Sequence, residues 1–125
     1  MRTIKASEDI SSLLKGGKRI STPFASIFIG KTSQQRDQYG RVAVAAGKRL
    51  GNAVFRNRCR RVMRASIQRL GGPWPLYDVV FVAHHSIASA SYMEIDNAFL
   101  KGLYKGKVIE NAVIKSSLRQ NELIK

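Results

Sequence analysis

The stretch that most constrains the fold of this chain lies between Lys48 and Arg64 and reads KRLGNAVFRNRCRRVMR. Seven of its seventeen residues are Lys or Arg, and none is acidic. Like charges repel one another along a helix, so this run weakens an isolated helix. The stretch therefore has to pack against a core through its apolar residues, and a polyanion is the natural source of the missing negative charge.

The same stretch predicts an amphipathic helix over residues 53–70, with Asn52 as its N-cap and the Gly71-Gly72-Pro73 sequence as its end. At about 100° per residue, one arc is expected to face the core. Its members are Phe55, Cys59, Val62, Met63, Ser66 and Leu70. The side opposite carries Asn57, Arg61, Arg64 and Gln68, and a ridge along one flank carries Arg56, Arg60 and Arg64. The planar fork of Arg binds phosphate and stacks on bases, which favours RNA as the polyanion.

A shorter helix is predicted upstream from the helical spacing of Ile10, Leu13 and Leu14, and the pair Gly16-Gly17 ends it. In this helix the apolar side chains are expected to belong to the core on spacing alone.

Three extended segments follow this helix. Residues 18–20 form a short extended piece, residues 24–29 (FASIFI) read as a strand, and residues 41–46 (RVAVAA) read as its partner strand. The polar residues 31–40 are the expected hairpin loop between the last two. Alternation along FASIFI places Phe24, Ser26 and Phe28 on one face and Ala25, Ile27 and Ile29 on the other.

Residues 77–83 (YDVVFVA) are apolar on both faces, which indicates a central strand with parallel pairing as an option. Ser91 and Glu94 have the spacing of a capping box at the start of the last helix. The fold class is therefore α/β, an α+β two-layer sandwich with the order α-β-β-β-α-β-α on a small mixed sheet. We expect one domain over residues 1–125, in which residues 107–125 form a helical piece or a loosely packed tail.

The amino-acid composition limits the classes of partner that this protein can have. A formal net charge of +14 on 125 residues and a pI near 10.7 are typical of a nucleic-acid binder, with an anionic membrane surface as the rival partner. The single Cys excludes an internal disulfide, no apolar run approaches the length of a membrane span, and the N-terminus has no apolar segment of a signal peptide. We therefore expect a cytoplasmic protein with no membrane partner and no small-molecule substrate.

No catalytic constellation can be identified in the sequence. Cys59 lies in the apolar arc, and His84 and His85 follow a strand without nearby carboxylates, so the first is interpreted as a small core residue and the pair as a loop with some RNA contact. Asp78 and Glu94 stand alone in the sequence. Trp74 is interpreted as a lid on the core. We expect no catalytic residues and no metal bound by the protein alone.

A resemblance to a known family rests on Gly51-Asn52-Ala53-Val54 (GNAV), followed by Arg56-Asn57-Arg58 and Arg60-Arg61. This arrangement resembles the signature of the bacterial ribonuclease P protein subunit. The early helix with its Gly-Lys/Arg turn, the strand RVAVAA before the motif and the segment YDVVFVA are also similar to that family. The resemblance covers some hundred residues, and only the motif is highly specific.

The resemblance implies a left-handed βαβ crossover through the motif helix, against the usual right-handed rule. It also implies an endoribonuclease in which an RNA subunit removes the 5′ leader of precursor tRNA with Mg²⁺ held mainly by that RNA and the scissile phosphate. The partners are then the catalytic RNA and precursor tRNA. The implied docking residues are Lys48, Arg49, Asn52, Arg56, Asn57, Arg58, Arg60, Arg61 and Arg64. The alternatives are a structural RNA binder such as a ribosomal protein and a protein-only RNA enzyme, which should show an acid–base or metal cluster.

The resemblance also implies a cleft that holds the single-stranded leader between the first helix and the sheet. The matching positions are Ile10, Leu14, Phe24, Ser26 and Phe28. Many family members carry aromatic residues at the two helix positions, whereas this chain has Ile and Leu, which cannot stack on bases. Phe28 is then the expected main stacking surface.

Overall fold

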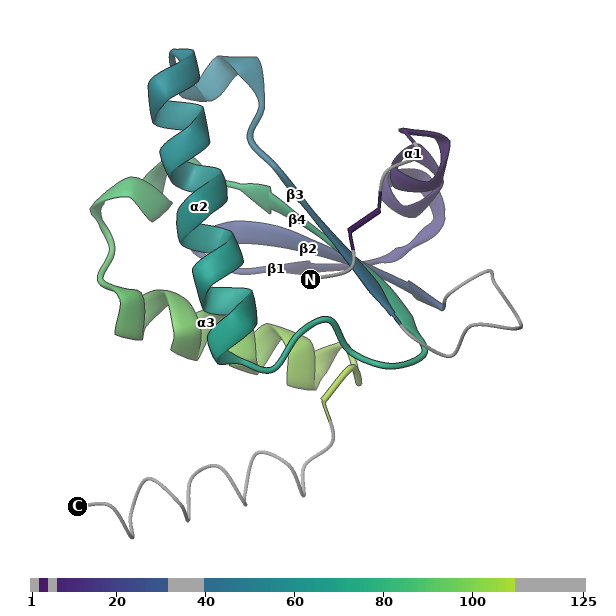
Figure 1. The fold of residues 1–125 in the computed structure, drawn as a ribbon. Helices are drawn as coiled ribbons and strands as arrows, with labels where there is room; N and C mark the ends of the chain where they lie inside the picture. The colour runs from purple at the N-terminus through teal and green to yellow at the C-terminus, as the bar shows by residue number, and fades with distance from the viewer. Residues whose placement is uncertain (1–2, 5–6, 32–39, 110–125) are drawn as a thin grey trace, which may run out of the picture.

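The fold is a four-stranded mixed sheet with two helices on one face and one helix on the other (Figure 1). The computed structural model describes residues 3–4, 7–31 and 40–109. The elements are α1 (Ser7–Gly16), β1 (Lys18–Ser21), β2 (Ala25–Lys31), β3 (Arg41–Ala45), a 3₁₀ turn η1 (Lys48–Leu50), α2 (Ala53–Arg69), β4 (Tyr77–Ala83), a second 3₁₀ turn η2 (His85–Ser89) and α3 (Tyr92–Lys105). This order and the α+β class confirm the sequence prediction.

The sheet has the strand order β1-β2-β4-β3. β4 pairs with β2 in the antiparallel sense and with β3 in the parallel sense. The predicted hairpin of residues 24–29 with residues 41–46 is therefore wrong, because β4 lies between the two strands. The physical reason is burial: β4 is apolar on both faces and occupies the position that is covered on every side. Its predicted central place is confirmed.

Alternation along the strands divides the core into two clusters. The larger one lies under α2 and α3 and includes Ile27, Val79, Phe81, Met63 and Phe99, each with no exposed surface. The smaller one lies on the opposite face of the sheet, where Ile10 and Leu13 of α1 and Phe28 of β2 pack against the buried Val80 and Ala43. The larger cluster joins α2 and α3 to one face of the sheet, and the smaller cluster joins α1 to the opposite face.

α2 begins and ends where the sequence indicates. The Asn52 side chain accepts a hydrogen bond from the backbone N–H of Phe55 at 2.9 Å, and Leu70 is the C-cap. Ser91 and Glu94 form the predicted capping box of α3. At the other end of α3, a Cβ on Gly102 would lie 2.9 Å from Cδ1 of Ile27, so the absence of a side chain lets the helix approach the sheet closely.

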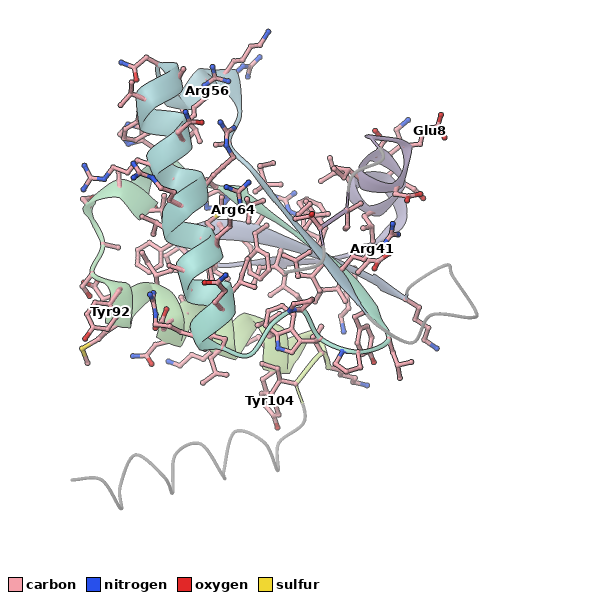
Figure 2. All side chains as sticks on the ribbon, viewed as in Figure 1. Glu8, Arg41, Arg56, Arg64, Tyr92 and Tyr104 are labelled. Carbon is pink, nitrogen blue, oxygen red and sulfur yellow. The ribbon has the colours of Figure 1, made fainter. Side chains whose placement is uncertain are left out.

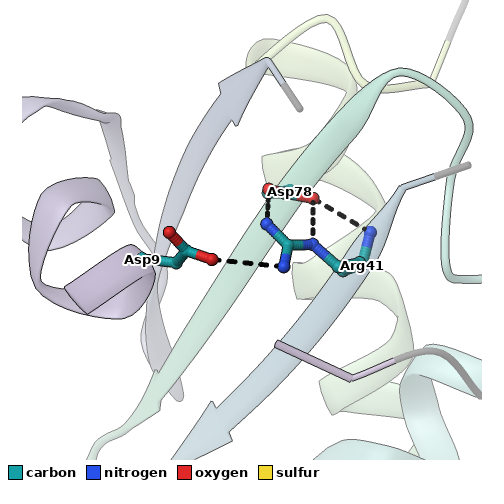
Figure 3. Close-up of polar contacts among 3 residues, drawn as sticks. All are labelled: Asp9, Arg41 and Asp78. Carbon is teal, nitrogen blue, oxygen red and sulfur yellow. Dashed lines mark hydrogen bonds and ion pairs between the residues drawn. The ribbon is translucent and has the colours of Figure 1, made fainter. Parts of the chain in front are cut away.

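Arg41 of β3 is held between two carboxylates on the α1 side of the sheet (Figure 3). Its guanidinium donates to Asp78 Oδ2 at 2.8 Å and to Asp9 Oδ2 of α1 at 3.2 Å, and its backbone N–H donates to Asp78 Oδ1 at 3.1 Å. Asp78, which appeared to stand alone in the sequence, is therefore paired and 4% exposed. These hydrogen bonds, above all those to Asp78, raise the pKa of Arg41.

Residues 31–40 were predicted to be a loop and residues 107–125 a tail. Residues 32–39 and 110–125 lie outside the described residues, so both predictions and the single-domain boundary stay predictions. Within the described part, Ile109 is 5% exposed and belongs to the larger core cluster.

Replacement of Asp78 by Asn should destabilise the protein, because the buried charge of Arg41 would lose its main partner. Breaking a buried ion pair from one side costs about 3–5 kcal/mol. Asp9→Asn is the matched control, since this carboxylate is 41% exposed and bonds the same guanidinium; its loss should cost about 1 kcal/mol or less. Urea unfolding of both variants measures the difference. Equal decreases in the free energy of unfolding would show that the Arg41–Asp78 pair contributes no more to stability than the Arg41–Asp9 pair.

Candidate nucleic-acid interface

The outward side of α2 carries a surface that we call the cationic face, formed by Arg56, Asn57, Arg58, Arg60, Arg61 and Arg64. Lys48 and Arg49 of η1 extend it beyond the helix N-terminus, and both are exposed. The buried residues of α2 are Cys59, Met63, Ser66 and Ile67. The predicted core arc is thus confirmed in outline, with Ile67 as a core residue that the wheel did not assign to it.

The turn before α2 explains the glycine of the GNAV motif. Gly51 has φ of 154°, which favours glycine, and a Cβ at this position would lie 3.2 Å from Cδ1 of Phe55. The next residue, Asn52, caps the helix. The first turn of the helix contains no acidic residue. The positive end of the helix dipole therefore adds to the charge of Lys48 and Arg49.

The five arginines of the cationic face have no ion-pair partner within the residues that the structure describes. The ion pairs found there join Arg41 to Asp9 and Asp78, and Arg69 to Asp96. Arg60 instead donates a hydrogen bond to the Asn57 side chain, and a shallow hollow is lined by Val54, Asn57, Arg60, Arg61 and Arg64. Arg56 and Arg64 mark the length of this surface in Figure 2. Its positive charge is consequently available to an external anion.

The second predicted site, on the α1 side of the sheet, is assembled in part. Ile10 and Phe28 pack together, and the guanidinium of Arg19 lies 5.9 Å from the centre of the Phe28 ring. Leu14 is 42% exposed, so the expectation that it is a core residue is wrong. Its place in the inward row is taken by Leu13.

The other two predicted cleft residues have different surroundings. Ser26 is buried, and its Oγ lies 2.9 Å from Nε2 of His84 at the end of β4. Phe24 precedes β2 and packs against the larger cluster, on the side of α2 and α3. The prediction that Phe24 shares a face with Phe28 is therefore wrong, because the strand alternation begins only at Ala25.

The remaining candidate residues, Trp74 and His85, pack against other aromatic side chains of the protein. Trp74 is 7% exposed and packs near Phe81, which confirms its interpretation as a lid on the core. His85 stacks on Phe55 with ring centres 5.2 Å apart. Among residues 3–4, 7–31 and 40–109, no group of three His, Cys, Asp or Glu side chains could hold a metal ion. In the same ranges, no helix is both long and apolar enough to cross a membrane.

Comparisons with known proteins agree with the motif. The family model described as Ribonuclease P matches residues 1–107. The ribonuclease P protein component of Oceanobacillus iheyensis is 31% identical over 117 residues, covering 93% of this chain and 95% of the relative. That of Clostridium beijerinckii is 29% identical over 119 residues, covering 86% and 94%.

Solved structures share the fold. The RNase P protein of Staphylococcus aureus superposes with a TM-score of 0.74 at 21% identity, covering 88% of this chain and 99% of the other. The RNase P protein from Thermotoga maritima gives a TM-score of 0.70 at 20% identity, covering 89% and 100%.

Cys59 should be unreactive in the native protein. Its thiol is 1% exposed, and burial raises its pKa, so the thiolate fraction near pH 8 is lower than that of a free cysteine despite Arg58 and Arg60 nearby. Labelling with a thiol reagent at pH 8 should be slow until urea unfolds the chain. Fast labelling of the folded protein would contradict the interpretation of Cys59 as a core residue.

Proposed function

The chain belongs to the ribonuclease P protein family, and we propose that the cationic face of α2 is the surface through which it binds the catalytic RNA. It is the protein component of ribonuclease P, an endoribonuclease of tRNA 5′ processing in which the RNA subunit carries the catalysis. An RNA partner and a tRNA substrate follow from this membership. A structural RNA-binding role, such as that of a ribosomal protein, is not favoured by the family match.

One observation carries the docking proposal: the described carboxylates that form ion pairs bond Arg41 and Arg69, and the arginines of the cationic face have no acid partner among the described residues. Arginines that the fold does not use are free to bond phosphate oxygens in pairs. The proposed docking set is Lys48, Arg49, Asn52, Arg56, Asn57, Arg58, Arg60, Arg61 and Arg64. In this set Asn52 serves mainly to hold the helix end that presents free backbone N–H groups.

We further propose that the 5′ leader lies on the α1 side of the sheet. The residues assigned to this cleft are Ile10, Leu14 and Phe28, and the buried Ser26 on the same sheet face supports them through its contact with His84. Phe28 offers the aromatic surface, and Arg19, whose guanidinium lies near the ring, offers a charge for a neighbouring phosphate. Phe24 is left out because it packs on the opposite face.

Mg²⁺ would be held by the RNA subunit and the scissile phosphate, and when bound it would supply charge stabilisation there. The residues of this chain then contribute through binding: phosphate contacts at α2 hold the subunits together, and the cleft positions the leader. A cytoplasmic location belongs to the same proposal.

The double variant Arg60→Gln and Arg61→Gln should weaken binding to the catalytic RNA and flatten its salt dependence. Each lost phosphate contact changes the slope of log K against log salt by about 0.7–0.9. Affinity measured over a salt series, with a thermal melt of each protein, gives both quantities.

The matched control is Lys101→Gln with Lys105→Gln, which removes the same charge from exposed positions of α3. If both pairs flatten the slope equally, overall charge and not the cationic face determines the binding. An unchanged slope with a lowered melting temperature would assign Arg60 and Arg61 to folding.

Phe28→Ala should weaken binding of precursor tRNA to the holoenzyme and spare mature tRNA, which has no leader. Stacking on an aromatic side chain is worth about 1–3 kcal/mol per base, so the loss should be about fivefold or more. Phe28 also packs against α1, so its melting temperature is expected to fall.

Leu14→Ala separates these effects, because Leu14 is 42% exposed and its truncation should leave the melting temperature unchanged. It should produce a smaller loss that is again specific to precursor tRNA. Leu76→Ala, at a leucine that is 53% exposed elsewhere, is the control. If Phe28→Ala weakens the affinity for precursor and mature tRNA equally, the proposal that the leader binds this face is wrong.

A further inference from the structure

Tyr92, the first residue of α3, is a large aromatic side chain that the core does not use. It is 63% exposed, and the neighbouring Met93 is 61% exposed. The guanidinium carbon of Arg69, at the end of α2, lies 5.3 Å from the centre of the Tyr92 ring. With Arg69 over one face of the ring and most of the residue in solvent, Tyr92 still presents open aromatic surface (Figure 2).

The position of Arg69 is fixed by bonds that join the two helices. Its Nε donates to Asp96 Oδ2 at 2.7 Å and its Nη2 donates to Asp96 Oδ1 at 2.9 Å. Ser66 of α2 donates to the same Oδ1 at 2.6 Å. Because Asp96 is engaged by these donors, its charge is compensated, and Arg69 is held in place beside the ring of Tyr92.

A second aromatic pair lies at the other end of the same flank of α2. Phe55 and His85 stack there with an interplanar angle of 28°. Phe55 and Arg69 are fourteen positions apart along the helix, which corresponds to about 21 Å. Arg58 lies between them along the helix axis, three helical turns before Arg69 and on the same flank. We call this row, which comprises Phe55, Arg58, Arg69, His85 and Tyr92, the stacking flank.

We propose that the stacking flank binds unpaired nucleotides of the catalytic RNA, which stack on Tyr92 and bond their phosphates to Arg58. The inference rests on the proposed function, since it extends the cationic face toward α3. Basic residues interleaved with aromatic rings are the arrangement that single-stranded nucleic acid favours. RNA fits better than an apolar protein partner because the flank carries arginines, and the nearby Glu94 is engaged with Ser91 in the capping box.

The competing interpretation is structural. Tyr92 could serve only to cover the bonds among Arg69, Asp96 and Ser66, in which case its removal would loosen the contact between α2 and α3. Stability and RNA affinity separate the two interpretations, because a stacking residue can be truncated without loss of the bonds beneath it.

The test uses Tyr92→Ala, Tyr92→Phe and, as a matched control, Tyr104→Ala, a tyrosine of the same helix that is 42% exposed at its far end. Affinity is measured for the full-length protein with the catalytic RNA and for the holoenzyme with precursor and mature tRNA. Tyr92→Ala should weaken binding of the catalytic RNA about fivefold or more. Tyr92→Phe and Tyr104→Ala should leave affinity unchanged, and the melting temperature should not move.

A loss confined to tRNA would place the substrate on this surface and would overturn the inference. Unchanged affinity for the catalytic RNA, or a loss no larger than that of Tyr104→Ala, also overturns it. So does a loss that is accompanied by a lower melting temperature and is not rescued by Phe. The Arg60 and Arg61 variant run in parallel tests the proposed function separately, since it can weaken binding while Tyr92→Ala does not.

Discussion

The parallel pairing of β3 with β4 sets the path of the chain between these two strands. Parallel neighbours cannot be joined by a tight turn, so the chain has to cross a face of the sheet before it returns. α2 makes this crossing, and its buried side chains, among them Met63 and Ile67, have no exposed surface. Because packing fixes which side of α2 faces inward, it also fixes the arginines on the outside.

The distribution of charge follows from the same arrangement. The buried Asp78 of β4 and Asp9 of α1 bond Arg41, and Asp96 of α3 bonds Arg69. These pairs hold α1 to the sheet and α3 to α2. They leave the cationic face without an acid partner in the described residues, which is the observation that supports the proposed RNA contact there.

The two faces of the sheet differ in how completely helices cover them. One face is closed by α2 and α3 over the larger core cluster, which gives α2 a rigid support. On the other face, α1 covers Val80 fully and Phe28 only in part. A partly covered aromatic ring beside Arg19 can contribute both to packing and to a binding surface, so stability and binding have to be measured together there.

The features that depend on near neighbours along the chain could be predicted from the sequence. Helical periodicity placed Arg61 and Arg64 of α2 on one side and Met63 on the other, and the caps at Asn52 and Ser91 form as their spacing predicts. The GNAV-RNR motif indicated the family that the comparisons then showed. All of these are contacts within a few residues, where backbone geometry leaves few alternatives.

The way in which those elements meet depends on contacts between residues that are far apart in the sequence. Adjacency in sequence favoured a hairpin of β2 with β3, whereas burial of both faces of β4 placed that strand between them. The contact of Ser26 with His84 spans 58 positions, and that of Arg41 with Asp78 spans 37. No periodicity encodes such pairs. They form because the sheet register brings these polar groups together in a place where an unpaired group would be costly.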